Sequence, residues 1–247
     1  MERISRHVRI VTREIKGGDN LIIHKSIKRI AVIGGTGREG KGLAYRWCIA
    51  GYSVIIGSRD INKAQSARSD LLDKFDQLDP HCLEYALNED AVSQCEVAVL
   101  TIPYQFHKEM ILNLKPYLDG KYLIDVTVPL VPPKVSVITI PPDGSAALHA
   151  QNLLGDKTKV ISAFQNISFE LLLSQNPIDC DVLVCGTDKD SREMGMQLVK
   201  DAGLVAWDAG PLENSIISEG LTSILIRINK EYGTHTAGIQ ITGVPRS

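Results

Sequence analysis

A glycine-rich turn between a strand and a helix is the feature that most limits how this chain can fold. Gly35, Gly37 and Gly40 have the spacing G-x-G-x-x-G, after the apolar segment 29–33 and before a segment with helical periodicity. In such a turn the first glycine permits a tight bend, the second admits a pyrophosphate against the backbone, and the third lets the helix pack on the strand. The context predicts a dinucleotide-binding fold, and the alternative is a glycine-rich loop without a ligand.

The residues at the end of the next expected strand distinguish NADP from NAD. About twenty positions after the turn, an apolar segment ends at Ser58 and Arg59, and Lys63 follows one helical turn later. A carboxylate here would accept from the ribose hydroxyls of NAD, whereas a hydroxyl beside a guanidinium favours the 2′-phosphate of NADP. Asp60 is interpreted as the N-cap of the next helix, with a ribose contact as the alternative. The pattern predicts NADP.

Composition is typical of an ordinary enzyme and favours no other class. The chain has 247 residues and a formal net charge of −2, so electrostatics gives no reason to expect nucleic acid as a partner. Five cysteines form no C-x-x-C pair, and neither a metal site nor a disulfide framework is indicated. Because there is no apolar run of roughly 18 residues and no signal-peptide core, we expect no membrane span and a cytoplasmic location.

Apolar segments alternate with helical patterns along most of the chain, which predicts an α/β fold. We expect a Rossmann, doubly wound parallel sheet with a smaller C-terminal α/β portion. The expected divisions are a basic N-terminal extension, flexible in one interpretation, over 1–27, a dinucleotide-binding domain over 28–165, and a substrate and dimerisation portion over 166–247.

Ligands bind at the carboxyl ends of the strands in open parallel sheets, so residues at those ends are site candidates. Ile102, Pro103 and Tyr104 follow the fourth expected strand, and Pro103 cannot continue its ladder. We therefore expect these three residues to lie at the ligand-binding edge of the sheet.

The end of the sixth expected strand supplies further candidates for contact with a ligand. Gln165, Asn166 and Ser168 are placed there to orient a carboxamide or a ring carbonyl. The alternative for Asn166 and Ser168 is capping of the helix that follows. For Phe169 three interpretations stay open: stacking on a flat substrate, narrowing of the pocket, or packing in the core.

Several motifs occur in an order that resembles the NADPH-dependent reductases of coenzyme F420, over about residues 28–241. They are GGTGREG at 34–40, GSR at 57–59 with Lys63, NEDA at 88–91, VLTIP at 99–103, PLVP at 129–132 and DAGPL at 208–212. The resemblance implies hydride exchange between NADP(H) and a deazaflavin, usually in a homodimer. It departs at QNIS (165–168), where archaeal members often carry histidine and proline, and at Phe169, where a small residue is usual.

The resemblance also implies which residues contact the cofactor. Those expected against the pyrophosphate are Thr36, Gly37, Arg38 and Glu39. Those expected against the 2′-phosphate are Ser58, Arg59 and Lys63. Those expected to flank the nicotinamide are Ile102, Pro103 and Tyr104.

No side chain stands out as a nucleophile, which is consistent with direct hydride transfer between two stacked rings. His107 and His149 are acid-base candidates, but each is interpreted as a surface or helix-packing histidine because neither has a carboxylate at a recognisable spacing. Ser145 is interpreted as a loop or cap residue. No catalytic residue is therefore assigned.

Three functions remain open from the sequence. The first is the deazaflavin and NADP oxidoreductase. The second is an NADP-dependent reductase of a small imine or carbonyl compound, with Asn166 and Lys230 or a histidine in the pocket. The third is a non-catalytic NADP-sensing protein whose basic N-terminal arm contacts an effector.

The last expected helix carries an apolar stripe formed by Leu221, Ile224, Leu225 and Ile228. This spacing places the four side chains on one helical face. The stripe fits a subunit interface of a homodimer, and a core position would satisfy the same pattern.

Overall fold

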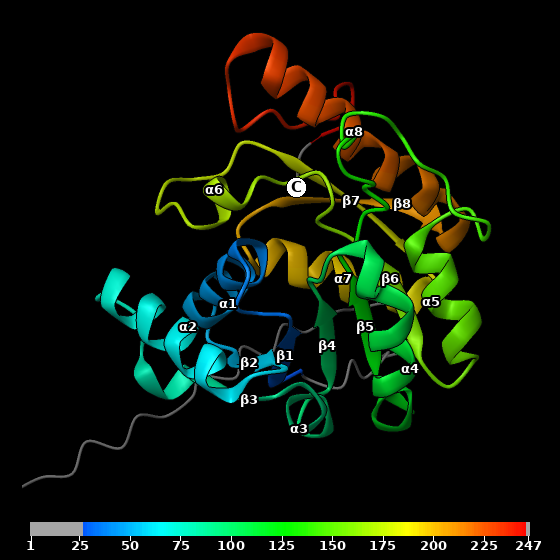
Figure 1. Cartoon of the computed structure of the whole chain (residues 1–247). Coiled ribbons are helices and arrows are strands. Elements are labelled where there is room, and N and C mark those ends of the chain that lie inside the picture. Colours follow the sequence, from blue (N-terminus) through cyan, green and yellow to red (C-terminus); the bar gives the residue numbers. More distant parts are fainter. Residues whose placement is uncertain (1–26, 246–247) are drawn as a thin grey trace, which may run out of the picture.

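One eight-stranded sheet forms the centre of the computed structural model, which describes residues 27–245. The strand order is β3-β2-β1-β4-β5-β6-β7-β8 (Figure 1). The strands are β1 (Arg29–Ile33), β2 (Ser53–Ser58), β3 (Leu83–Leu87), β4 (Val97–Leu100), β5 (Tyr122–Asp125), β6 (Lys159–Ser162), β7 (Asp181–Gly186) and β8 (Val205–Pro211).

Helices cover both faces of this sheet. They are α1 (Arg38–Ile49), α2 (Ile61–Lys74), α3 (Asn88–Ser93), α4 (His107–Leu118), α5 (Ala146–Leu154), α6 (Phe169–Leu172), α7 (Lys189–Asp201) and α8 (Ser215–Tyr232). Short 3-10 turns occur at Pro80–Cys82, Tyr104–Phe106 and Leu212–Asn214.

Alternation along the buried strands divides the apolar core into two layers. In β1, Ile30 and Val32 pack with α1, α2 and α7, whereas Ala31 and Ile33 pack with α3, α4 and α5. All four side chains are fully buried. A strand buried on both faces reads as a continuous apolar run, as expected for a parallel sheet covered by helices.

The chain reverses its direction of winding between β1 and β4. Strand β1 pairs in parallel with β2 on one side and with β4 on the other. Helices after β1 and after β4 therefore lie on opposite faces, and a crevice opens at the carboxyl ends of these two strands. Figure 1 shows α1 and α4 on either side of this position.

The second half of the sheet contains one antiparallel pair. Strand β7 runs antiparallel to β6, with Ile161 opposite Gly186, and β8 then runs parallel to β7. The connection 163–180 consequently begins and ends at the same edge of the sheet as the crevice. Strands β7 and β8 extend the same sheet, so the division between 165 and 166 stays a prediction.

The Rossmann-type α/β fold predicted from the sequence is confirmed. The predicted caps are also present, since Asp60 accepts from two backbone N–H groups of α2 and Ser145 accepts from Leu148 N of α5. The basic extension proposed for 1–27 lies almost entirely outside the described residues. Within 27–245, no helix is both long and apolar enough to cross a membrane.

Candidate active site

The turn after β1 brings bare backbone to the crevice. Gly34 has φ +71°, a conformation that glycine adopts without strain. A Cβ on Gly35 would lie 2.7 Å from the carbonyl oxygen of Val32, and one on Gly40 would lie 2.6 Å from the Cα of Gly35. Within 27–245, no side chain caps the N-terminus of α1. Its first N–H groups are therefore available to an anion.

A cavity of about 280 Å³ lies beside this turn. Its lining residues are Gly34, Thr36, Gly37, Ser58, Arg59, Asp60, Lys63, Asn88, Thr101, Ile102, Pro103, Phe106 and Met110. The predicted residues Ser58, Arg59 and Lys63 are thus brought together on one wall. The carboxylate of Asp60 accepts from Asn62 N at 2.9 Å and is turned toward the helix.

Phe106 and Asn88 are among the lining residues of this cavity that were not predicted as contacts. Phe106 lies under the guanidinium of Arg59, at 5.1 Å from ring centroid to Cζ, and fixes the direction of that side chain. Asn88 is buried, and its Oδ1 has no hydrogen-bond partner in the part of the chain that the structure describes. The NEDA motif at 88–91 was the one signal in the sequence that could have indicated Asn88 as a contact.

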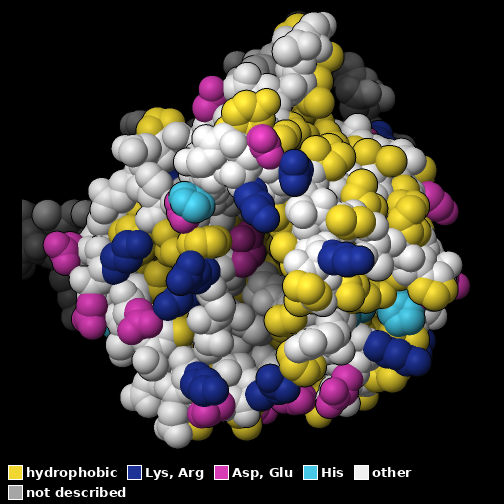
Figure 2. All heavy atoms as spheres, turned by 45° about the horizontal axis from the view of Figure 1, so that its top comes forward, with side chains coloured by type: hydrophobic (Ala, Val, Ile, Leu, Met, Phe, Trp, Pro, Cys, Tyr) yellow, Lys and Arg dark blue, Asp and Glu magenta, His cyan; other side chains and the backbone are white. Residues whose placement is uncertain are grey.

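A larger cavity of about 680 Å³ lies next to the first. Its lining residues are Glu39, Thr101, Ile102, Pro103, Tyr104, Gln105, Val126, Thr127, Val128, Leu130, Val131, Pro132, Val135, Phe164, Gln165, Ile167 and Thr222. The two cavities share Thr101, Ile102 and Pro103 at the carboxyl end of β4. Figure 2 shows a hollow on this face with Lys and Arg side chains around its mouth.

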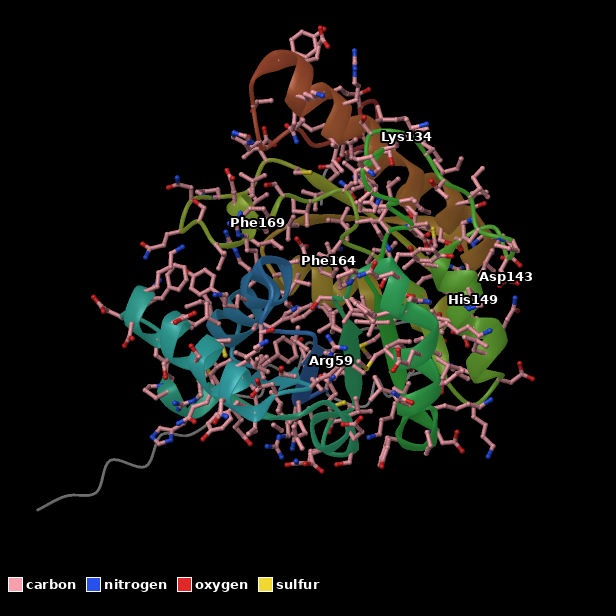
Figure 3. All side chains as sticks on the ribbon, viewed as in Figure 1. Arg59, Lys134, Asp143, His149, Phe164 and Phe169 are labelled. Atoms are coloured by element: carbon pink, nitrogen blue, oxygen red, sulfur yellow. The ribbon has the colours of Figure 1, made fainter. Side chains whose placement is uncertain are left out.

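The wall formed after β6 depends on an unusual backbone conformation. Phe164 has φ +74°, a left-handed conformation that is uncommon for a bulky residue, and its ring packs edge-on against Trp47 at 5.7 Å between centroids. Figure 3 places Phe164 in the middle of the molecule, beside α1. The next residue, Gln165, is turned into the cavity wall, where its Nε2 donates to Asp125 O and Ser162 Oγ, each at 2.8 Å.

Asn166, Ser168 and Phe169, three of the residues predicted for the second substrate, do not line this cavity. Asn166 is buried behind it, and its Nδ2 donates to Asp181 O at 2.7 Å. Ser168 caps α6 by accepting from Glu170 N. Phe169 lies under the guanidinium of Arg38, in a separate open depression that Lys230 and His235 also line. Within the segment 165–168, Gln165 and Ile167 line the larger cavity, and Gln165 is the one polar residue of the two.

His107 lies in the interior on α4, so of its two interpretations the surface position is wrong and the helix-packing position is confirmed. Its Nε2 is 2.6 Å from Oδ2 of Asp125, and both side chains are fully buried. Burial lowers the pKa of His107, but the charge and hydrogen bond of Asp125 outweigh it, and the net shift is upward. Asp125 also accepts from Thr127 N at 3.0 Å, so this pair holds the cavity wall in place. The sequence did not indicate Asp125 as the partner of His107 because the two residues are 18 positions apart.

His149 has a carboxylate partner as well, in Asp143. Figure 3 shows these two side chains together near the start of α5. Nearby, Glu219 of α8 accepts from Ala146 N at 2.7 Å and from Ala147 N at 3.1 Å. Burial raises the pKa of Glu219 to about 8. These contacts fasten α5 to its neighbours, which makes them structural.

Comparison with known proteins identifies relatives over most of this chain. The family model "NADP oxidoreductase coenzyme F420-dependent" matches residues 29–129. An F420-dependent NADP reductase of Methanothermobacter marburgensis is 41% identical over 224 residues, 88% of this chain and 99% of the relative. One of Methanocaldococcus jannaschii is 38% identical over 222 residues, 87% of this chain and 99% of the relative.

A solved structure shares the fold. It is described as a putative F420-dependent NADP reductase of Arthrobacter sp. FB24, with a TM-score of 0.72 and 23% identity, covering 88% of this chain and all of that one. That similarity supports the fold alone. The identities near 40%, over nearly the full length of the two Methanothermobacter and Methanocaldococcus reductases, also establish the family. The chain belongs to the family of F420-dependent NADP reductases.

Proposed function

We propose that the protein transfers a hydride between NADP(H) and coenzyme F420, a deazaflavin. The observation that carries this proposal is the contact between two cavities at Thr101, Ile102 and Pro103. One cavity has the features of a dinucleotide site, and the other, at about 680 Å³, has room for a flat second ring. Molecules bound in both would meet at the carboxyl end of β4.

The first cavity fits NADP because the chain offers a partner to each of its anionic groups. The uncapped N-terminus of α1 would hold the pyrophosphate through backbone N–H groups. Ser58, Arg59 and Lys63 would hold the 2′-phosphate. Asn88, with its free Oδ1, would accept from the adenosine half. Bound NADPH supplies the hydride.

The second cavity fits a substrate that reacts because it is held in the correct position beside the cofactor. Val126, Phe164 and Ile167 give it apolar walls that exclude water, and Ile102 and Pro103 set the floor on which the two rings face each other. No protein nucleophile is needed for such a transfer. Its rate depends on how closely the walls align the donor and acceptor carbons.

The test is anaerobic mixing of the protein with NADPH and oxidised coenzyme F420, followed by the visible absorbance of the deazaflavin. We expect rapid bleaching that requires NADPH. Riboflavin phosphate and a small cyclic imine serve as parallel acceptors. Oxidation of NADPH by the imine without any bleaching of the deazaflavin would overturn the proposal in favour of a small-molecule reductase.

We also propose that the protein is a homodimer. Leu225 of the predicted stripe is buried, but Ile224 and Ile228 are 46% and 37% exposed. The segment 137–140 lies along α8, where Ser223 Oγ approaches Val137 O at 3.5 Å, and it adds further exposed apolar side chains. Figure 2 shows hydrophobic side chains gathered on this side of the molecule. A second copy would cover them.

Two further assignments belong with this proposal. We place the protein in the cytoplasm, supported by the five free thiols, since a reducing compartment keeps such cysteines unpaired. We also assign residues 28–165 to binding of the dinucleotide and 166–247 to the substrate side and dimer contact. Thr222 of α8 in the wall of the larger cavity supports the second part of this division.

A further inference from the structure

Three buried polar atoms without a partner surround the larger cavity. They are Glu39 Oε1, Thr127 Oγ1 and Gln165 Oε1, none of which has a hydrogen-bond partner within 27–245. All three residues line the same cavity. Buried polar atoms are nearly always satisfied in folded proteins, so three orphans around one cavity indicate polar groups of a ligand.

Two of these residues offer neutral hydrogen bonds. Both hydrogens of Gln165 Nε2 are directed to Asp125 O and Ser162 Oγ, which leaves Oε1 as a fixed acceptor. The backbone N–H of Thr127 is held by Asp125, and its hydroxyl is free to rotate. Neither group exchanges a proton near neutral pH. They can orient a heterocycle, but they cannot complete its reduction.

Glu39 differs because it carries an exchangeable proton. It is the second residue of α1, at the junction between the phosphate-binding turn and the larger cavity. Burial raises the pKa of its carboxyl group to about 8, with no neighbouring charge contributing. The group is therefore a neutral acid at pH 7, able to donate through one oxygen and accept through the other.

The titratable groups on the surrounding elements are few. Tyr104 lines the same cavity, and burial raises its pKa. The guanidinium of Arg38 on α1 lies over the ring of Phe169. Glu170 of α6 lines the same open depression as these two residues. The remaining groups nearby are Glu219 of α8, bound to the backbone of α5, Asp125 of β5, paired with His107, and Lys134 in the loop beside Val135. None is paired with Glu39.

We propose that Glu39 is the acid that gives the second substrate its proton when it accepts the hydride. This inference rests on the proposed function. The C–H bond of the reduced nicotinamide breaks, a C–H bond forms on the deazaflavin ring, and the electron pair displaced through that conjugated ring is taken up at a ring nitrogen. The carboxyl O–H of Glu39 breaks as the N–H bond forms, and solvent then reprotonates the carboxylate. NADPH is oxidised and the deazaflavin is reduced.

The test compares wild type with Glu39→Gln, which has the shape and hydrogen-bonding capacity of the neutral acid but no proton to transfer. We expect single-turnover bleaching at pH 7 to be about 100-fold slower or more in E39Q, the usual scale of general acid catalysis. In wild type the rate should fall above pH 8, and in E39Q this dependence should be absent. NADPH affinity should change less than about threefold, because the substitution leaves the binding contacts of NADPH in place.

A readout independent of turnover is the infrared band of the protonated carboxyl group in the protein without ligands. The difference spectrum between wild type and E39Q should contain one such band, which titrates near pH 8. The control is Glu109→Gln, an exposed position on α4, which should leave rate, pH profile and infrared band unchanged.

Two outcomes would overturn this inference. If E39Q retains the wild-type rate and loses the pH dependence, Glu39 only donates a hydrogen bond; if it retains the pH dependence, another group is the acid. Failure of the proposed function itself looks different, because wild type then bleaches no deazaflavin while the infrared titration still reports the state of Glu39.

Discussion

Single side chains at the carboxyl ends of the strands determine what the crevice can bind. Arg59 has its guanidinium over Phe106, on the wall that Ser58 and Lys63 share. The stacking leaves the N–H groups free for an anion and reduces the rotamer freedom that binding would otherwise remove. At this scale the cofactor preference depends on a few contacts, each open to substitution.

Replacement of Arg59 by alanine should separate NADPH from NADH. A hydrogen bond to a charged group contributes about 1.5–3 kcal/mol, so NADPH affinity should fall about 10- to 100-fold while NADH affinity changes little. Fluorescence titration of both cofactors measures this difference. Lys157→Ala, which removes an exposed cation far from the cavity, is the control. Equal losses for both cofactors would exclude the 2′-phosphate contact.

The buried pair of His107 and Asp125 should make stability depend on pH. Because the pKa of His107 is raised in the folded state, the stabilisation is complete below its unfolded value of about 6.5 and is lost as pH rises through the folded value. The difference in unfolding free energy between wild type and His107→Gln, measured in urea, should therefore shrink from pH 6 to pH 9. A constant difference would mean that His107 is neutral throughout.

At the scale of elements, β1, its turn and α1 act as one unit. The glycine spacing predicted this unit because Gly35 and Gly40 each have a local steric reason that a sequence can express. The caps Asp60 and Ser145 were predictable for the same reason. The larger cavity was not, since its walls come from α1, three connecting segments and α8, and no local pattern reports which distant segments meet.

Gly40→Ala should disrupt this unit. The new Cβ would lie 2.6 Å from Gly35 Cα and 2.8 Å from Thr101 Oγ1, so the turn has to move. NADPH affinity should fall at least about tenfold, with a loss of stability of about 1–3 kcal/mol from overpacking. The matched control is Gly220→Ala on α8, where the Cβ would meet Ile138 at an ordinary 3.6 Å. Calorimetric titration and thermal denaturation report the two effects.

At the scale of the whole molecule, the exposure of apolar side chains differs from one region to another. Most apolar side chains of the sheet and of the helices that cover it are buried, whereas α8 and the segment 137–140 present isoleucines to solvent. The sequence predicted the stripe on α8 but not the loop beside it. Partial exposure distinguishes an interface from a core position, and it emerges only from the assembled structure.

Charged substitution of the exposed stripe should change the state of association. The double variant Ile224→Glu, Ile228→Glu should sediment as a monomer if the wild type is a dimer through this face, because burying carboxylates from both subunits against apolar surface is costly. Ile49→Glu, a similarly exposed isoleucine on α1, should leave sedimentation unchanged. A dimer that survives the double variant would use another surface.

Because the chain reverses direction between β6 and β7, the connection on the substrate side is separate from the segments on the cofactor side. Because β7 starts at the edge where β6 ends, residues 163–180 do not cross to the opposite edge of the sheet. The buried side chains of this connection, such as Phe164 and Leu172, pack in the core, whereas its exposed positions can change without altering the sheet. The strands and turn proposed to bind the dinucleotide contain none of these residues. A relative could therefore acquire a new electron acceptor through changes within this one connection.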